Sequence, residues 1–321
     1  MLHVKAALTL AIAVWLATIP AQAADEIPGR TASPPGSLSV MFVGDIMLDG
    51  GPGHAIASGR DPFAACAALL MNADFTIGNL ECVLGRGGKR VLKNYSFRAA
   101  KDSPTLLKRY FSGVSVANNH SFDFGPEGLV EMLAILDREG IPRFGAGAML
   151  AEARRPLILE KKGEENGLRI ALLGANGYRA DNYAPGETTA GVAPLREAEI
   201  LAAIAAARKQ ADAVVPFVHW GPELVAQPRE ADMALARKMI DAGASAVIGS
   251  HPHVTQTIDI HRGVPIIYSL GNFVFDYFPD DPPQWTGWVA KLTFAKNQPV
   301  GLETRAVVLD PAGLPSPARE D

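Results

Sequence analysis

The chain has 321 residues, 48% of them apolar, which is enough to bury the core of one large domain or two ordinary ones. Its formal net charge is −4 at pH 7, and this mild acidity argues against nucleic acid as a partner. The two cysteines match no zinc pattern, so the sequence leaves open whether Cys66 and Cys82 form a disulfide or remain buried thiols.

The first 23 residues have the features of a secretory signal peptide. Lys5 precedes an apolar run, and residues 21–23 read Ala-Gln-Ala, which is typical of a cleavage site. The run is shorter than the roughly 20 residues of a membrane span, so an uncleaved anchor is the weaker alternative. We expect a secreted protein, periplasmic in a Gram-negative cell, with no stable membrane span after cleavage. Residues 24–37 are expected to form a flexible linker and residues 311–321 a disordered tail.

Strands and helices alternate between residues 38 and 310, which we expect to form one domain. The first half predicts strands over 37–45, 74–79, 113–120 and 141–147, and helices over 61–73, with Asp61 as its cap, and 125–140. Two strands joined by a polar turn follow over 155–174, and then a helix over 195–211. The second half predicts strands over 212–221 and 244–254, a helix over 229–243, a hairpin over 255–273 and edge strands over 287–296 and 300–310. This order predicts the α/β class, with two sheets packed face to face and helices outside.

Polar side chains stand at the carboxyl end of nearly every predicted strand. Because open α/β sheets bind ligands in the crevice at these ends, the groups are expected to converge on one place. Each group alone has a structural alternative, such as a turn cap, a helix cap or a satisfied core histidine. The groups are Asp45, Asn79, Glu81, Asn118, Asn119, His120, His219, His251 and His253.

The pair His251 and His253 is the most informative of these groups. Pro252 disfavours the helical region for His251, and residues i and i+2 of an extended chain point the same way, so both rings are predicted to face one spot. Imidazoles, carboxylates and an amide oxygen without thiolate suit Zn, Mn or Fe. The number of ligands favours two ions bridged by a carboxylate, with a further histidine to protonate a leaving oxygen.

A Gly-rich basic segment, residues 85–98, follows Glu81 closely. It indicates either an anionic substrate or a solvated hairpin. The stretch "SLGNFVFD" offers Asn272 and Asp276 to the crevice, while its aromatic side chains are expected to fill the core. His54 and His261 are expected to be exposed.

Eight stretches in order resemble the CapA-type capsule and poly-γ-glutamate biosynthesis family, which is itself similar to the calcineurin-like metallophosphatases. They are "VGDIML", "IGNLE", "YSFRA", "VANNHSFDFGPEGL", "IPRFGAG", "VHWG", "GSHPHV" and "YSLGNFVFD". The resemblance runs from about Leu38 to Asp276 and implies a four-layer α/β/β/α sandwich.

The resemblance also implies roles for the site residues. Asp45 and His120 would be catalytic, with His120 as general acid, and the cofactor would be one or two divalent ions of Mn, Zn or Fe. The implied metal ligands are Asp45, Glu81 as the bridging carboxylate, Asn119, His219, His251 and His253. Apart from the resemblance, the residues expected to bind substrate are Asn79, Asn118, Arg86, Lys89, Arg98, Glu223 and Asn272.

Two departures from the metallophosphatase pattern predict a weaker first metal site. Asp45 is followed by Ile46 and Met47 where those enzymes have Asp-x-His, and the bridging carboxylate comes from a Glu.

The expected function is that of an exported protein of capsule or poly-γ-glutamate biosynthesis, with a metal-dependent site that hydrolyses a phosphoester or an anionic polymer. One alternative is a non-catalytic accessory that binds the growing polyanion beside the machinery for polymer synthesis and export. Another is a metal-free enzyme in which Asp45, Glu81 and His120 move protons on a peptide-like substrate.

Overall fold

The structure is a computed structural model that describes residues 29–161, 167–276 and 282–319. The predicted signal peptide and the first residues of the predicted linker lie outside the described residues. Within the described part of the chain, no helix is long and apolar enough to cross a membrane.

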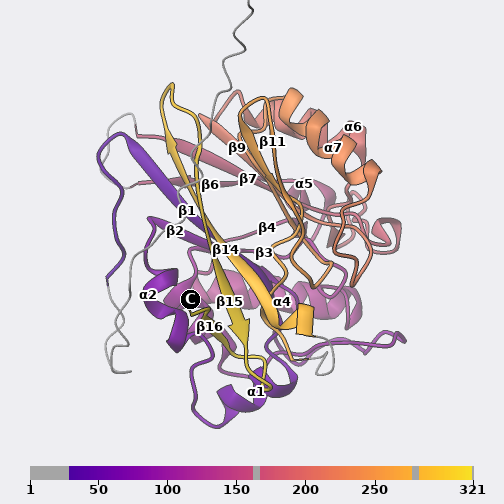
Figure 1. Cartoon of the computed structure of the whole chain (residues 1–321). Helices are drawn as coiled ribbons and strands as arrows, with labels where there is room; N and C mark the ends of the chain where they lie inside the picture. The colour runs from indigo at the N-terminus through magenta and orange to yellow at the C-terminus, as the bar shows by residue number, and fades with distance from the viewer. Residues whose placement is uncertain (1–28, 162–166, 277–281, 320–321) are drawn as a thin grey trace, which may run out of the picture.

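Two mixed sheets form the centre of the molecule (Figure 1). The first has the order β16-β15-β14-β1-β2-β3-β4, with β13 beside the end of β1. Its strands are β1 (Ser37–Ile46), β2 (Phe75–Leu80), β3 (Gly113–Ser115), β4 (Arg143–Phe144), β13 (Asn272–Val274), β14 (Thr286–Ala295), β15 (Gly301–Leu309) and β16 (Pro315–Pro317).

The second sheet has the order β11-β12-β10-β9-β7-β6. Its strands are β6 (Leu157–Glu160), β7 (Arg169–Asn176), β9 (Ala213–His219), β10 (Val247–Ser250), β11 (Ile258–His261) and β12 (Val264–Ile267). A separate pair, β5 (Ala146–Gly147) and β8 (Gly191–Val192), completes the described strands. The inner strands β7, β9, β10 and β12 run parallel, as do β1 to β4.

Helices cover the outer face of each sheet. The first sheet carries α1 (Gly50–Ala57), α2 (Ala67–Leu70), α3 (Ser103–Tyr110) and α4 (Gly125–Glu139), and the second carries α6 (Glu197–Ala207) and α7 (Glu230–Asp241). The short elements are α5 (Leu150–Ala153), η1 (Ala64–Cys66), η2 (Ala180–Asn182) and η3 (Pro282–Trp285).

Alternation along β1 explains why the sheets stack. Val40 and Phe42 point into a core shared with the second sheet, while Met41 and Val43 point into the core under the helices. The ring of Phe42 meets the ring of Phe217 on β9 edge to face, with the centroids 6.0 Å apart. Three apolar layers therefore separate four structural layers, and the predicted α/β/β/α sandwich is confirmed.

Several predicted elements need correction. The helix expected over 61–73 is only η1 followed by α2, because Asp61 accepts a hydrogen bond from the N–H of Phe63 in a turn rather than capping a helix. Helices α1 and α3 are present in the structure but were not predicted. The strand expected over 141–147 is broken into β4 and β5 at Gly145, whose φ is 91°.

The two ends of the domain are more ordered than the sequence predicts. Arg30, in the predicted linker, donates hydrogen bonds to Thr76 and to the carbonyl of Tyr110. In the predicted disordered tail, residues 315–317 form β16, so disorder there was a wrong expectation. Cys66 and Cys82 are both free and buried, which settles the alternative between a disulfide and buried thiols.

Candidate metal centre

The carboxyl ends of the parallel strands of both sheets meet at one place. In the first sheet, Asp45 on β1 is in register with Asn79 on β2 and Asn272 on β13. In the second sheet, His219 on β9 is in register with Ser250 on β10. The strand ends converge as the sequence predicts. The implied metal ligands and the implied general acid are all buried there, namely Asp45, Glu81, Asn119, His120, His219, His251 and His253.

The carboxylate of Glu81 is the centre of this group. Its Oε1 lies 3.3 Å from Nε2 of His219, 3.9 Å from Nε2 of His120 and 4.0 Å from Nε2 of His253. Among the described residues, Oε1 has no hydrogen-bond partner although it is fully buried. Three imidazole nitrogens therefore face one carboxylate oxygen that no hydrogen bond satisfies.

Neighbouring polar groups fix the orientation of two of these imidazoles through Nδ1. The Nδ1 of His253 lies 2.9 Å from Oδ1 of Asn272 and 3.3 Å from Oδ2 of Asp45. The Nδ1 of His219 lies 3.1 Å from the hydroxyl of Ser250. Metal-binding histidines are commonly held by a polar partner on the ring nitrogen that does not bind the ion, as Nδ1 of His253 is here. The Nε2 of His219 lies 2.8 Å from Oδ1 of Asn119, another predicted ligand.

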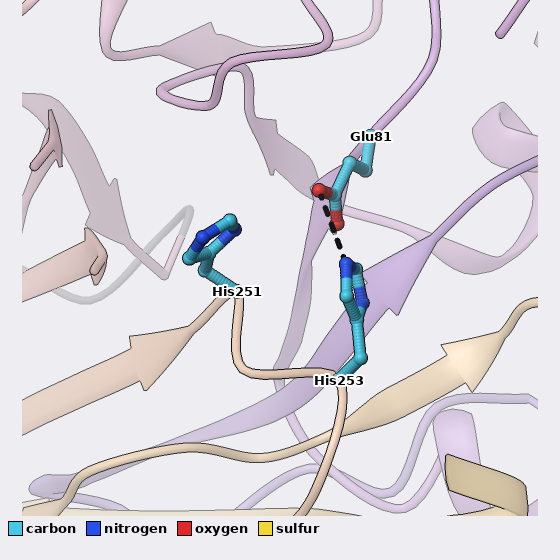
Figure 2. A group of neighbouring side chains, drawn as sticks. All are labelled: Glu81, His251 and His253. Carbon is cyan, nitrogen blue, oxygen red and sulfur yellow. Dashed lines mark ion pairs between the residues drawn. The ribbon is translucent and has the colours of Figure 1, made fainter. Parts of the chain in front are cut away.

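His251 lacks such partners. In the part of the chain that the structure describes, neither of its ring nitrogens has a hydrogen bond, although the side chain is completely buried. An unpaired buried polar group costs free energy, so a ligand at this ring would remove a real penalty. Figure 2 shows the rings of His251 and His253 on one turn, with the carboxylate of Glu81 beside them.

The predicted reason for the convergence of His251 and His253 was wrong. Strand β10 ends at Ser250, and the two histidines have left-handed φ values of 98° and 58° rather than extended backbone. A tight turn around Pro252 therefore brings the rings together. Left-handed backbone is costly for residues with a Cβ, and it concentrates at functional sites.

Three asparagines that are expected to bind substrate form hydrogen bonds with the predicted metal ligands and their neighbours. Asn79 donates to Oδ1 of Asp45 over 2.8 Å and accepts from Asn118. The other end of the Asn118 amide, its Oδ1, accepts from the N–H of His120. Asn272 holds Nδ1 of His253 through its Oδ1, as described above. The amide groups of these residues are engaged in holding the site together, and we assign them a supporting role.

The basic segment 85–98 contains two kinds of cation. Arg86 and Lys89 are exposed, as is Glu223 on another loop. Arg98, in contrast, donates to the carbonyls of Gly85 and Gly87 and lies 3.5 Å from the ring centroid of Phe124. Arg98 therefore fixes the base of the loop. Asp276 likewise accepts from the N–H of Gly51 and belongs to the support of α1.

Sequence reasoning missed two supporting residues, Asp123 and Lys93. Oδ2 of Asp123 lies 2.9 Å from Nδ1 of His120, and its other oxygen forms an ion pair with Lys93. Lys93 also donates to the carbonyl of Asn119 over 3.0 Å. The available signal in the sequence was the separation of three positions between His120 and Asp123, which allows their side chains to meet.

The pKa values of the site separate charged from neutral groups. Burial and the nearby charge of Asp45 raise the pKa of Glu81 well above its ordinary value. Burial opposes ionisation of Asp45, but the hydrogen bond and charge of His253 lower its pKa. Burial lowers the pKa of His219 to about 3, and it also lowers the pKa of His251. Two imidazoles are thus neutral at physiological pH, as metal ligands must be.

The residues fit a divalent cation. Two groups have ligand atoms that all lie within 4.8 Å of one another, and Glu81 belongs to both. One group is Asp45, Glu81 and His219, and the other is Glu81, His251 and His253. The orphaned atoms of Glu81 and His251 would gain partners from an ion. At the position of the histidine in the metallophosphatase pattern Asp-x-His, this chain has Met47. The Met47 side chain is buried, and its sulfur accepts a hydrogen bond from the N–H of Asp49.

The two-sheet sandwich is a metallo-dependent phosphatase-like fold. The fold is similar to that of a 5′-nucleotidase precursor from Thermus thermophilus, with a TM-score of 0.51 at 12% identity over 87% of this chain and 56% of that one. It is also similar to the NAD nucleotidase NadN of Haemophilus influenzae, with a TM-score of 0.50 at 11% identity over 89% of this chain and 54% of that one.

The chain belongs to the family described as bacterial capsule synthesis protein PGA_cap, whose model matches residues 39–277. It is 34% identical over 248 residues to the PGA biosynthesis protein CapA of Bacillus subtilis (strain 168), which covers 74% of this chain and 63% of that protein. It is 31% identical over 251 residues to the capsule biosynthesis protein CapA of Bacillus anthracis, with shares of 74% and 60%. The chain thus spans less than two thirds of the length of these relatives. The family predicted from the sequence is confirmed.

Proposed function

We propose that this protein is an exported, metal-dependent hydrolase of capsule or poly-γ-glutamate biosynthesis. The observation that carries the proposal is the unsatisfied Oε1 of Glu81, which lies within 4.0 Å of the Nε2 atoms of His120, His219 and His253. The names of the Bacillus relatives, which refer to PGA and capsule biosynthesis, support this setting.

The chain would hold the cation with ligands from both sheets. Glu81 would be shared, with Asp45, Asn119, His219, His251 and His253 around it. Bound Mn, Zn or Fe would supply an activated water near neutral pH and would stabilise negative charge on the substrate.

In this proposal His120 moves the proton. The carboxylate of Asp123 accepts the hydrogen bond from Nδ1–H, which directs Nε2 toward Glu81. Burial lowers the pKa of His120, although Asp123 acts in the opposite direction. A bound anionic substrate would favour the protonated ring, which then donates its proton from Nε2 to the leaving oxygen.

The substrate class that we propose is a phosphoester or an anionic polymer. The divalent cation that the site would hold suits an anion, and the exposed cations Arg86 and Lys89 belong to a loop that follows Glu81 in the sequence. The polymer synthesis and export machinery is the proposed partner of the protein in the cell.

The test combines metal content with turnover. Purified protein is stripped with a chelator, reloaded with Mn²⁺ or Zn²⁺, and assayed with bis(p-nitrophenyl) phosphate and with poly-γ-glutamate. The proposal expects turnover only after reloading, loss of turnover in His251→Ala, and full turnover in His54→Ala, because His54 is exposed on α1. Equal turnover by stripped and reloaded protein would overturn the metal requirement.

A second function is favoured by one observation, the buried Met47 at the position where metallophosphatases have an imidazole. In this alternative the protein binds the growing polyanion without hydrolysing it. Metal-loaded protein that binds poly-γ-glutamate but hydrolyses neither substrate would select the accessory function over the hydrolase.

A further inference from the structure

The loop after β7 places an aromatic ring and a cation at the edge of the metal centre. The ring of Tyr178 contacts the ring of His251, with their centroids 4.4 Å apart. The guanidinium carbon of Arg179 lies 5.4 Å from the centroid of the same Tyr178 ring, and Arg179 is exposed. A surface cation is thus connected through one ring to the histidine that lacks hydrogen bonds.

The end of β7 fixes the position of this loop. Asn176 is fully buried and in register with His219 on β9. Its amide accepts from the N–H of Tyr178 over 3.1 Å and donates to the carbonyl of Tyr178 over 3.0 Å. These two hydrogen bonds fix the backbone of Tyr178 beside the centre, and they therefore restrict the position of Arg179, the next residue.

Arg179 has a strained backbone. Its φ is 46°, in the left-handed region that favours glycine. A side chain with a Cβ is costly there, and such residues concentrate at binding sites and active sites. The loop has a glycine at position 177, but the residue with left-handed backbone is Arg179 and not this glycine.

A second cation, Lys93, shares one neighbour with Arg179. Nζ of Lys93 is 3.0 Å from the carbonyl of Asn119 and 5.9 Å from the ring centroid of Tyr183. Arg179 also acts electrostatically on the hydroxyl of Tyr183. Lys93 and Arg179 therefore approach one tyrosine from two separate loops. Lys93 is paired with the buried carboxylate of Asp123, so Arg179 is the exposed member of the two.

We infer that Arg179 binds a carboxylate of an anionic polymer chain, next to the group that occupies the metal centre. A guanidinium binds a carboxylate through two parallel hydrogen bonds, and the ring of Tyr178 holds the guanidinium plane. Repeated carboxylates suit this arrangement better than an isolated phosphoester does, because one carboxylate can occupy the centre while another pairs with Arg179. This inference rests on the proposed function and specifies its substrate as a polycarboxylate.

The experiment measures the binding of poly-γ-glutamate to metal-loaded protein at low salt. Arg179→Ala is expected to raise the Kd roughly tenfold, as loss of a charge-assisted contact requires. Arg179→Lys should recover part of the affinity. The methyl-esterified polymer, which has no charge, should bind wild type and Arg179→Ala equally weakly.

Arg262 provides a matched control. It too is exposed and left-handed, with a φ of 53°, but it lies in the turn between β11 and β12. That turn precedes β12, which runs parallel to β10, so it is at the opposite end of the sheet from the centre. Arg262 forms an ion pair with Asp241, so the comparison concerns polymer binding and not Tm. Arg179→Gly should weaken binding of the polymer, and Arg262→Gly should leave it at the wild-type value.

Polymer binding by Arg179→Ala or Arg179→Gly that equals wild type would overturn the inference, as would wild-type protein that does not bind the polymer. The outcome is separate from that for the proposed hydrolase. If metal-loaded wild type hydrolyses a phosphodiester but Arg179→Ala binds the polymer as tightly as wild type, the role of Arg179 is refuted and the proposed hydrolase is not. Absence of turnover with a weakened Arg179→Ala complex removes only the hydrolase.

Discussion

Replacing Glu81 by Gln should stabilise the metal-free protein at neutral and alkaline pH. The carboxyl group is fully buried, its Oε1 has no hydrogen-bond partner among the described residues, and Asp45 is nearby. Burial and the charge of Asp45 raise the pKa of Glu81 well above 4.5. The native state therefore keeps this proton to a higher pH than the unfolded chain does. The contribution of this carboxyl group to the free energy of unfolding is fully present below its pKa in the unfolded chain. It is lost as pH rises through its pKa in the folded protein.

The size of the effect follows from the pKa difference. Each unit by which the folded pKa exceeds the unfolded one costs about 1.4 kcal/mol above the folded pKa. For a domain of this size, 1 kcal/mol corresponds to a Tm change of roughly 2–4 °C. Gln cannot ionise and has nearly the same volume as Glu, so Glu81→Gln removes the penalty without creating a cavity.

The assay is thermal unfolding in excess chelator between pH 4 and pH 8, followed by circular dichroism. Metal-free Glu81→Gln should melt above metal-free wild type at pH 8, and the difference should vanish near pH 4. Added Mn²⁺ should raise the Tm of wild type and leave that of the variant nearly unchanged, because ligands that bind only the native state stabilise it. Identical Tm values for both metal-free proteins at every pH would refute the reasoning.

The remaining predictions concern the core, the close approach of two strands, and the proposed acid. Phe217→Ala, which removes the ring that meets Phe42 between the sheets, should cost about 3–5 kcal/mol in urea unfolding, and a cost below 1 kcal/mol would contradict the inter-sheet packing. Gly44→Ala should prevent normal folding, since its Cβ would lie 1.8 Å from the carbonyl oxygen of Gly271, whereas Gly29→Ala meets nothing within 4 Å and should keep the wild-type Tm. Asp123→Asn should lower kcat roughly 100-fold or more at unchanged metal content, because Nδ1 of His120 loses its carboxylate; an unchanged kcat would show that His120 does not move the proton.

The sequence predicted the sandwich because its strands carry strong local signals. Apolar runs that end in Gly-Asp or His give the strands, and period-2 alternation on β1 gives both cores. It missed α1, whose Gly-rich sequence "GGPGHAIA" lacks an amphipathic pattern and whose first turn is capped by Asp49. Local signals also failed at 61–73, where a turn at Asp61 replaces the first half of the expected helix.

The candidate site was predictable as a set of residue types but not as an arrangement. The strand-end rule brought Asp45, Glu81 and His219 together correctly. It gave no means of telling that the amide of Asn118 turns to the backbone of Leu80 and His120, since this depends on neighbouring strands in space. The left-handed turn at His251 and the position of Arg179 likewise depend on tertiary contacts.

Metal binding by the stripped protein tests the central claim most directly. Isothermal titration with Mn²⁺ or Zn²⁺ should show saturable binding by wild type and by His54→Ala, and a loss of affinity of at least tenfold in His251→Ala and in Glu81→Gln. Wild-type protein that binds neither ion, or a His251→Ala variant that binds as tightly as wild type, would contradict a metal centre built around Glu81.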